Sequence, residues 1–113
     1  MKTTSPHLVR LLAATTLALG VSATAHAQDK AKAKQLHNRA TAAMCANCHG
    51  TDGRTIEGSA IPSLVGMPKE YMVLQIKAFK DGSRPATVMH QITKGLTNAQ
   101  IDTISSYYAA TKR

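Results

Sequence analysis

Two cysteines separated by two residues, with a histidine directly after the second, constrain this chain more than any other feature. They are Cys45, Cys48 and His49. This C-x-x-C-H pattern is typical of covalent haem attachment. Two thiols at this spacing, at the end of a helix, can reach the two vinyl groups on one edge of a porphyrin, and the adjacent imidazole then lies beneath the iron. The pattern predicts one covalently bound haem c, with His49 as an iron ligand.

Three other uses of these residues fit the sequence less well. A disulfide that closes so short a loop constrains little of the unfolded chain and stabilises the fold weakly. A thioredoxin-type C-x-x-C pair belongs in a βαβ setting, and no strand pattern flanks this one. A zinc site would need a fourth ligand, and the chain has no second C-x-x-C pair to supply it. Haem attachment is therefore the favoured interpretation.

Residues 1–27 have the layout of a secretory signal peptide. Lys2 and Arg10 make the start basic, residues 11–21 form an uncharged apolar run, and Ala25 and Ala27 supply the small-x-small pattern that a signal peptidase cleaves. The apolar run is shorter than the roughly 20 residues that span a bilayer, which disfavours an uncleaved anchor. We expect export to the periplasm and a mature domain of residues 28–113 without a membrane span.

The 86 residues of this mature domain make a poor core on their own. A domain near this size buries only about 60% of the surface of its unfolded chain. This one contains one Phe, three Tyr and no Trp, so large apolar side chains are scarce. A bound haem would add both an apolar body and a metal to this small core.

The chain is basic, with a net charge of +8. Lys2 and Arg10 of the signal peptide account for two of these charges, so residues 28–113 carry +6. Part of the excess is a run of three lysines, at positions 30, 32 and 34. The run is either a solvated tail or a docking patch for an acidic partner. Binding to nucleic acid is disfavoured, because export removes the protein from nucleic acid and no binding motif appears.

Composition and apolar spacing predict four helices and no strand, which makes the fold class all-α. The helices are expected over residues 29–43, 69–80, 86–94 and 97–112, with an irregular loop over 50–66. Pro68 suits the first position of the second helix, and Gly82 and Gly95 end the second and third.

The last helix has the clearest predicted start. Thr97 and Gln100 have the spacing of a capping box, in which each side chain binds an otherwise free backbone N–H. Leu96 and Ile101 stand at the two positions of a hydrophobic staple. These local patterns fix where the helix begins.

Five motifs occur in an order that resembles a known family. They are CANCHGTDG at 45–53, PSLVG at 62–66, YMVLQIKAFKDGSRP at 71–85, ATVM at 86–89 and KGLTNAQI at 94–101. The chain resembles the class I cytochromes c, and most closely the small single-haem domains related to cytochrome c4 and the cytochrome subunit of flavocytochrome c sulfide dehydrogenase. The resemblance implies the cytochrome c fold, with about four helices wrapped around one covalently bound haem.

Six side chains could supply a second axial ligand to the iron. They are Met44, Met67, Met72, Met89, His37 and His90. Met44 adjoins the first cysteine and cannot cross to the opposite face of the haem. Met72 stands inside the second long helix, where core packing is the expected role.

Met89 is the favoured second ligand. It lies 40 residues beyond His49, which lets the chain wrap the haem and present sulfur from the far side, whereas Met67 lies only 18 residues beyond it. The resemblance agrees, because the family's axial methionine falls in the ATVM motif. His90 remains the rival, by bis-His ligation.

The resemblance also implies three supporting contacts. Pro62 matches a proline whose carbonyl accepts a hydrogen bond from the axial imidazole. Arg84 matches a basic residue near the haem edge that pairs with a propionate. The family packs its first helix against its last, and here Ala40 with Tyr107 or Tyr108 is the expected contact.

Two protein ligands on the iron favour electron transfer over other chemistry, because small molecules then cannot bind without displacing one. We therefore expect a periplasmic carrier, not an enzyme, that passes single electrons between redox proteins by Fe(II)/Fe(III) cycling. One alternative is the electron-transfer subunit of a sulfide-oxidising complex, with a flavoprotein as its partner. The other is a haem sensor or peroxidase-like enzyme with a labile sixth ligand.

Overall fold

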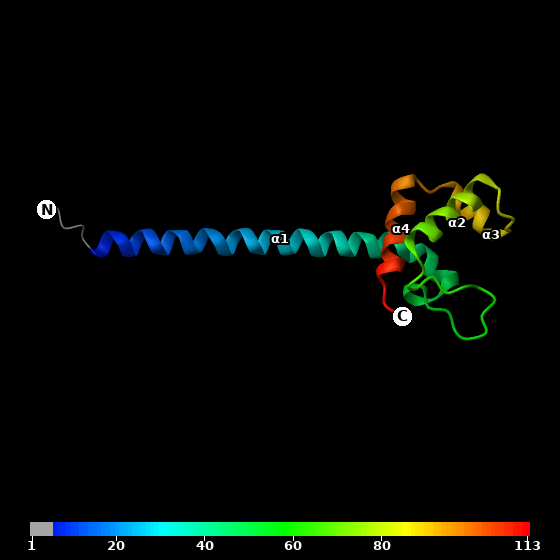
Figure 1. Cartoon of the computed structure of the whole chain (residues 1–113), viewed down its shortest axis with the longest axis horizontal. Coiled ribbons are helices and arrows are strands. Elements are labelled where there is room, and N and C mark those ends of the chain that lie inside the picture. The colour runs from blue at the N-terminus through cyan, green and yellow to red at the C-terminus, as the bar shows by residue number, and fades with distance from the viewer. Residues whose placement is uncertain (1–5) are drawn as a thin grey trace. The chain divides into compact units, whose positions relative to one another are not determined.

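The computed structural model describes residues 6–113, and only the backbone of residues 6–25. Residues 1–5 of the predicted signal peptide lie outside this range. The described residues form helices and no strand, so the all-α prediction is confirmed. The elements are α1 (Pro6–His49), the 3-10 turn η1 (Thr51–Gly53), α2 (Lys69–Asp81), α3 (Val88–Lys94) and α4 (Asn98–Ala110) (Figure 1).

The chain divides into two compact units, residues 1–35 and 36–113. The described part of the first unit belongs to α1, which begins at Pro6 and not near residue 29 as the sequence predicted. Residues 6–28 are rich in Ala and Leu, which are strong helix formers, so the helix continues through the predicted cleavage point. None of the described helices combines the length and apolar character needed to cross a membrane.

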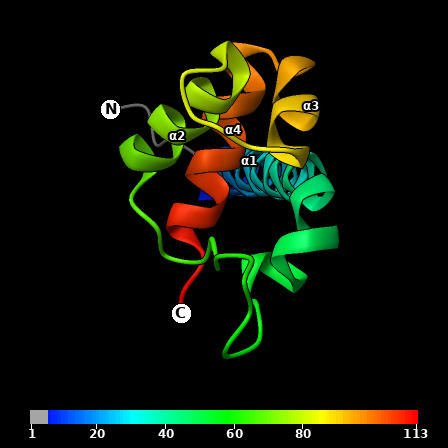
Figure 2. The same ribbon diagram turned by 90° about the vertical axis from the view of Figure 1, so that its right-hand side faces the viewer.

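In the second unit, α1 ends at His49 because Gly50 takes an extended conformation with a positive φ, at φ 79° and ψ 163°, which only glycine adopts readily. The single turn η1 follows, and residues 54–68 then form an irregular loop, coloured green in Figure 2. The predicted loop over 50–66 is therefore confirmed apart from the short turn at its start.

α2 packs against both α3 and α4 (Figure 2). Pro68 occupies its N-cap and is not the first helical residue as predicted. Gly82 ends α2 in the left-handed conformation, with φ of 85°. α3 starts two residues later than predicted and ends at Lys94, directly before Gly95.

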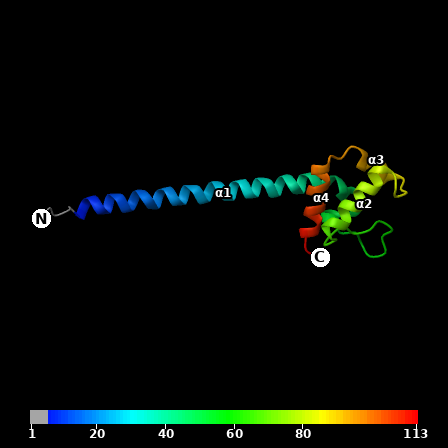
Figure 3. The same ribbon diagram turned by 45° about the horizontal axis from the view of Figure 1, so that its top comes forward.

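The predicted start of α4 is confirmed in detail. The backbone N–H of Gln100 donates to Thr97 Oγ1 at 3.2 Å, and the backbone N–H of Thr97 donates to Gln100 Oε1 at 2.8 Å. Leu96 and Ile101, the two staple residues, are both buried. α4 crosses the C-terminal part of α1 in both Figure 1 and Figure 3.

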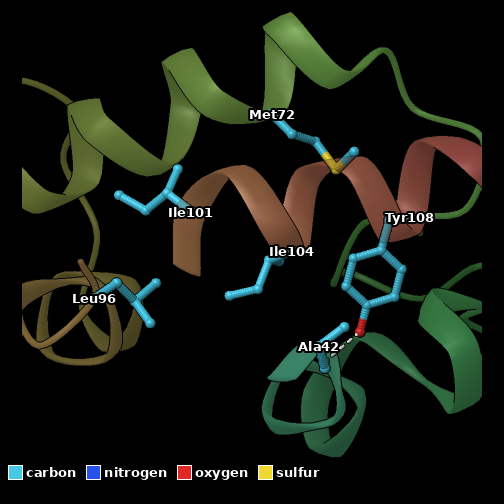
Figure 4. Packing of buried hydrophobic residues seen from close by; sticks show 6 residues of the cluster. All are labelled: Ala42, Met72, Leu96, Ile101, Ile104 and Tyr108. Carbon is cyan, nitrogen blue, oxygen red and sulfur yellow. Dashed lines mark hydrogen bonds between the residues drawn. The ribbon is translucent and has the colours of Figure 1, made fainter. Parts of the chain in front are cut away.

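The core lies where α1, α2 and α4 meet. Its buried members are Ala42, Met72, Leu96, Ile101, Ile104 and Tyr108 (Figure 4). The Tyr108 hydroxyl donates to the carbonyl oxygen of Ala42 at 2.7 Å, which joins the last helix to the first. Tyr108 was expected at this contact, but Ala40 was wrong and is exposed. Residues 40 and 42 lie about 200° apart around a helix, so only one can face α4.

Candidate functional site

The C-x-x-C-H motif forms the last turn of α1. Cys45 and Cys48 are three positions apart on the helix, so both thiols project from neighbouring parts of one face. Both are free thiols, with Cys48 exposed and Cys45 partly buried against the core. The geometry leaves both sulfur atoms available for covalent attachment.

His49 is the last residue of α1, and its ring is held by one hydrogen bond. Nδ1 lies 2.7 Å from the carbonyl oxygen of Pro62, and the side chain is largely buried. A carbonyl oxygen can only accept, so Nδ1 carries the ring proton. The lone pair is then on Nε2, which is the nitrogen left to bind a metal. This is the contact that the resemblance implied for Pro62.

Cys45 is tied to the core through Tyr108. Burial raises the pKa of the Cys45 thiol above its ordinary value, and the Tyr108 hydroxyl beside it acts in the opposite direction. Burial also raises the pKa of Tyr108. Both groups are therefore neutral at neutral pH, and the attachment turn is anchored to α4 without a buried charge.

Large apolar side chains are exposed on three segments of the described residues. Ile61 in the loop, Leu74 on α2 and Val88 on α3 are 39%, 63% and 57% exposed. Exposed aliphatic side chains on three separate segments are the kind of surface that a bound porphyrin would shield from water. Together with two free thiols and an imidazole with a free Nε2, they fit a covalently bound haem.

The structure separates the candidates for the second axial ligand. Met72 is buried in the core, which confirms its predicted packing role. Met67 packs against the same cluster, and Met44 lies on α1 directly before the cysteines. Met89 lies in the first turn of α3, where it is partly exposed. Met67 and Met72 therefore pack in or against the core, whereas Met89 lies outside this cluster.

Both ring nitrogens of the rival ligand, His90, are already in use. Nδ1 lies 2.7 Å from the carbonyl oxygen of Phe79, and Nε2 accepts a hydrogen bond from the backbone N–H of Ala86 at 3.0 Å. Binding iron through either nitrogen would break one of these bonds. Sequence reasoning missed both contacts: Phe79 lies across the α2–α3 connection, and Ala86, four residues before His90, has no recognisable capping pattern with it.

Arg84 lies on the same connection. Its guanidinium carbon is 4.4 Å from the centre of the Phe79 ring, and it donates a hydrogen bond to Gln75 Oε1. Neither neighbour was expected, since nothing in the local sequence pairs an arginine with residues on the preceding helix. The guanidinium group has five N–H donors, so these contacts leave it able to bind a further anion.

A family profile described as cytochrome c matches residues 30–112. The chain belongs to the cytochrome c family. As a member of this family it has covalently bound haem c and the electron-transfer role of cytochromes c. The expectations of family, fold, cofactor and electron transfer are therefore confirmed.

Two relatives and one solved structure place this cytochrome c more closely. It is 45% identical over 64 residues to the cytochrome subunit of sulfide dehydrogenase of Chlorobaculum tepidum, covering 57% of this chain and 56% of that protein. It is 34% identical over 103 residues to cytochrome c4 of Pseudomonas aeruginosa, covering 91% and 49%. The cytochrome c4 structure of Acidithiobacillus ferrooxidans superposes with a TM-score of 0.55 at 35% identity, covering 58% and 37%. The chain thus spans about half the length of these two relatives.

Proposed function

We propose that this cytochrome c is a periplasmic carrier of single electrons, with haem c attached to Cys45 and Cys48 and with His49 and Met89 as axial ligands. The observation that carries the proposal is the 2.7 Å bond from His49 Nδ1 to the Pro62 carbonyl, which leaves Nε2 free beside two free thiols. When bound, haem c supplies the one-electron chemistry, since its iron alternates between Fe(II) and Fe(III).

The residues of the chain set how readily that electron is taken up. The Pro62 carbonyl holds the ring of His49 in one orientation and raises its basicity as a ligand. The thioether of Met89 is a soft ligand that favours Fe(II), so it raises the reduction potential. With His49 and Met89 both holding the iron, an external ligand would have to displace one of these side chains. Arg84 retains free donors with which to pair a haem propionate.

Replacing Met89 tests the axial assignment. Met89→Ala should abolish the weak red sulfur-to-iron band of the oxidised protein and lower its reduction potential. Met67→Ala is the matched control and should change neither, since Met67 packs against the core. The opposite pattern would move the ligand to Met67. Rapid carbon monoxide binding by the reduced wild-type protein would favour a haem sensor or a peroxidase-like enzyme instead.

Export is part of the proposal. Its support is the basic start, the apolar run and the Ala25-His26-Ala27 motif in the sequence. The intact mass of the protein recovered from the periplasm should equal residues 28–113 plus one haem. A mass that still includes residues 1–27, or recovery only from the cytoplasm, would contradict cleavage and export.

A second candidate function is the electron-transfer subunit of a sulfide-oxidising complex. It is favoured by the 45% identity to a protein named as the cytochrome subunit of sulfide dehydrogenase. In that case the partner would be a flavoprotein that remains bound. A free carrier and a fixed subunit differ in how they associate: the carrier dissociates after each turnover, whereas the subunit remains bound.

A further inference from the structure

The connection between α2 and α3 carries a side chain that holds both of its ends. His90 Nδ1 donates to the carbonyl oxygen of Phe79, in the last turn of α2. His90 Nε2 accepts from the backbone N–H of Ala86, just before α3. One imidazole therefore joins the end of one helix to the start of the next, across residues 80–89.

We propose that His90 is a positioning residue for Met89, and not an iron ligand. This role rests on the proposed function, in which Met89 binds the iron. The two His90 bonds fix where α3 begins, and therefore where the Met89 sulfur lies. Met89 and His90 are neighbours in the chain, so a shift of α3 moves both.

The position of Phe79 explains why its hydrogen bond with His90 Nδ1 matters. The last four carbonyl groups of a helix have no partner inside it, and the Phe79 carbonyl is one of these in α2. The Ala78 carbonyl accepts from the backbone N–H of Arg84 at 3.0 Å, and the Phe79 carbonyl is satisfied by His90. His90 thus caps α2 from a distance of eleven residues.

α3 has few other means of holding its start. It is seven residues long, which is too short for a helix to be stable by itself, and its N-cap residue, Thr87, makes no side-chain cap bond. On its C-terminal side Thr93 is fully buried, and its hydroxyl donates within the helix to the carbonyl oxygen of Met89 at 2.8 Å. The N-terminal side depends on the bond between Ala86 and His90.

Aromatic contacts keep the imidazole in place. The rings of Phe79 and His90 meet edge to face, with centroids 6.4 Å apart. The Arg84 guanidinium lies on the same Phe79 ring and is tied to Gln75. These contacts therefore involve side chains of α2, the connection and α3, and rotation of His90 alone would disturb all three.

Two conservative variants separate the two bonds. His90→Asn places an amide N–H near the position of Nδ1 and keeps the bond to Phe79, whereas His90→Gln places an amide oxygen near Nε2 and keeps the bond to Ala86. His90→Ala removes both. His37→Asn is the matched control, because His37 is an exposed histidine of α1. All four are prepared as haem-loaded protein, with Met89→Ala as the reference for a lost ligand.

The measurement is the rate at which added imidazole removes the sulfur-to-iron band of the oxidised protein. Imidazole can bind only when Met89 leaves the iron, so this rate reports how firmly Met89 is held. We expect His90→Ala to accelerate it about tenfold, from the loss of two hydrogen bonds. His90→Asn and His90→Gln should fall between this value and that of the wild type, and His37→Asn should match the wild type.

The outcomes distinguish the inference from the proposed function. If the band survives in Met89→Ala, the axial assignment itself is wrong. If Met89→Ala abolishes the band but the His90 variants exchange at the wild-type rate, only the positioning role is wrong. A wild type without a sulfur band, whose low-spin spectrum is lost in His90→Gln, would make His90 the ligand. Should His90→Ala fail to fold, the Asn and Gln variants decide the matter in the same way.

Discussion

Two neighbouring tyrosines near the end of α4 have opposite environments. Tyr108 is 1% exposed and donates to the Ala42 carbonyl, whereas Tyr107 is partly exposed and donates to Asp52 Oδ1 at 2.6 Å. Their rings meet edge to face, 5.1 Å apart. A buried tyrosine normally finds a partner for its hydroxyl, and here the two partners lie on either side of the haem attachment turn. Together they tie α4 to the sequence around Cys45.

Tyr108→Phe should lower the free energy of unfolding by about 1 kcal/mol or more, because it removes a hydrogen bond inside the core. Tyr107→Phe removes a partly exposed hydrogen bond. The free energy of unfolding that it costs should be smaller at low pH, where Asp52 is protonated. Guanidinium denaturation of the haem-loaded protein, followed by helical circular dichroism, measures both. A Tyr108→Phe protein as stable as the wild type would show that the Ala42 contact contributes nothing.

The pKa of Asp52 gives Tyr107→Phe a distinct pH dependence. The hydrogen bond from Tyr107 is the main cause that lowers this pKa, and the Arg39 charge, 3.4 Å away, lowers it further. Because the pKa of Asp52 is lowered in the folded state, its ionised carboxylate stabilises the fold at pH values above the ordinary pKa of about 3.9. This stabilisation is lost as the pH falls through the lowered pKa. The deficit of Tyr107→Phe should therefore be larger at pH 7 than at pH 2.

Denaturation at these two pH values measures the change, with Tyr108→Phe as the control. The Tyr108 bond joins a hydroxyl to a carbonyl, so its loss should cost a similar amount at both. A Tyr107→Phe deficit that stays constant between pH 7 and pH 2 would show that the hydrogen bond does not hold the pKa of Asp52 down.

At the scale of elements, the helix boundaries that depend on local signals were predictable. The capping box of Thr97 and Gln100 fixed the start of α4, and Gly82 fixed the end of α2, because each acts within a few residues of itself. The N-terminal extension of α1 was missed, since a change of segment was expected near the cleavage motif while the helix-forming composition continues.

The contacts between elements could not be predicted in the same way. The choice of Ala42 over Ala40 depends on how α1 is rotated against α4, which no local pattern determines. The two bonds of His90 depend on how the α2–α3 connection closes. By contrast, the cysteines and His49 were found at once, because haem attachment fixes their spacing within five consecutive residues.

Gly53 in η1 links the attachment turn to the Pro62 segment. Its carbonyl accepts from the backbone N–H of Leu64 at 2.8 Å and from the Ser63 hydroxyl at 2.7 Å. Its φ is 78°, and a Cβ there would lie 2.7 Å from the Tyr108 ring. Any side chain would therefore push against the core and displace the segment that holds His49.

Gly53→Ala should thus be far more destabilising than Gly58→Ala. Gly58 has nearly the same φ, 77°, but no atom lies within 4 Å of its added Cβ, so it reports backbone strain alone. Strain of this kind costs about 1–2 kcal/mol, and overpacking at Gly53 adds about 1–3 kcal/mol. Thermal unfolding of the haem-loaded variants measures the difference. Equal destabilisation by the two variants would mean that the Tyr108 ring moves aside freely.

At the scale of the whole molecule, the proposed haem site is assembled from distant segments around a small protein core. The cysteines and His49 come from α1, Pro62 from the loop and Met89 from α3. The buried apolar cluster lies between α1, α2 and α4 and contains no residue of α3, whose start is held by the bonds of His90. We therefore expect loss of the iron–sulfur bond to require much less free energy than unfolding of the core.

The charge of the molecule distinguishes a free carrier from a fixed subunit. Residues 28–113 carry +6, which two haem propionates reduce to about +4 at neutral pH. A carrier dissociates after each turnover, so its interface should be small, polar at the rim and steered by charge. A subunit would bury a larger apolar surface, and salt would then have little effect on its association.

For a free carrier, the rate of electron transfer to an acidic redox protein should fall steeply between 0.1 M and 1 M salt. The Debye length shortens from about 10 Å to about 3 Å over this range, which screens the attraction between the partners. Stopped-flow kinetics measures the rate, and replacing Lys30, Lys32 and Lys34 by Gln tests whether the N-terminal run contributes.

Gel filtration of the natively expressed protein at 1 M salt gives the decisive comparison. Elution as a monomer supports the carrier, whereas a stoichiometric complex with a flavin-containing chain would establish the subunit, because only an apolar interface survives such screening.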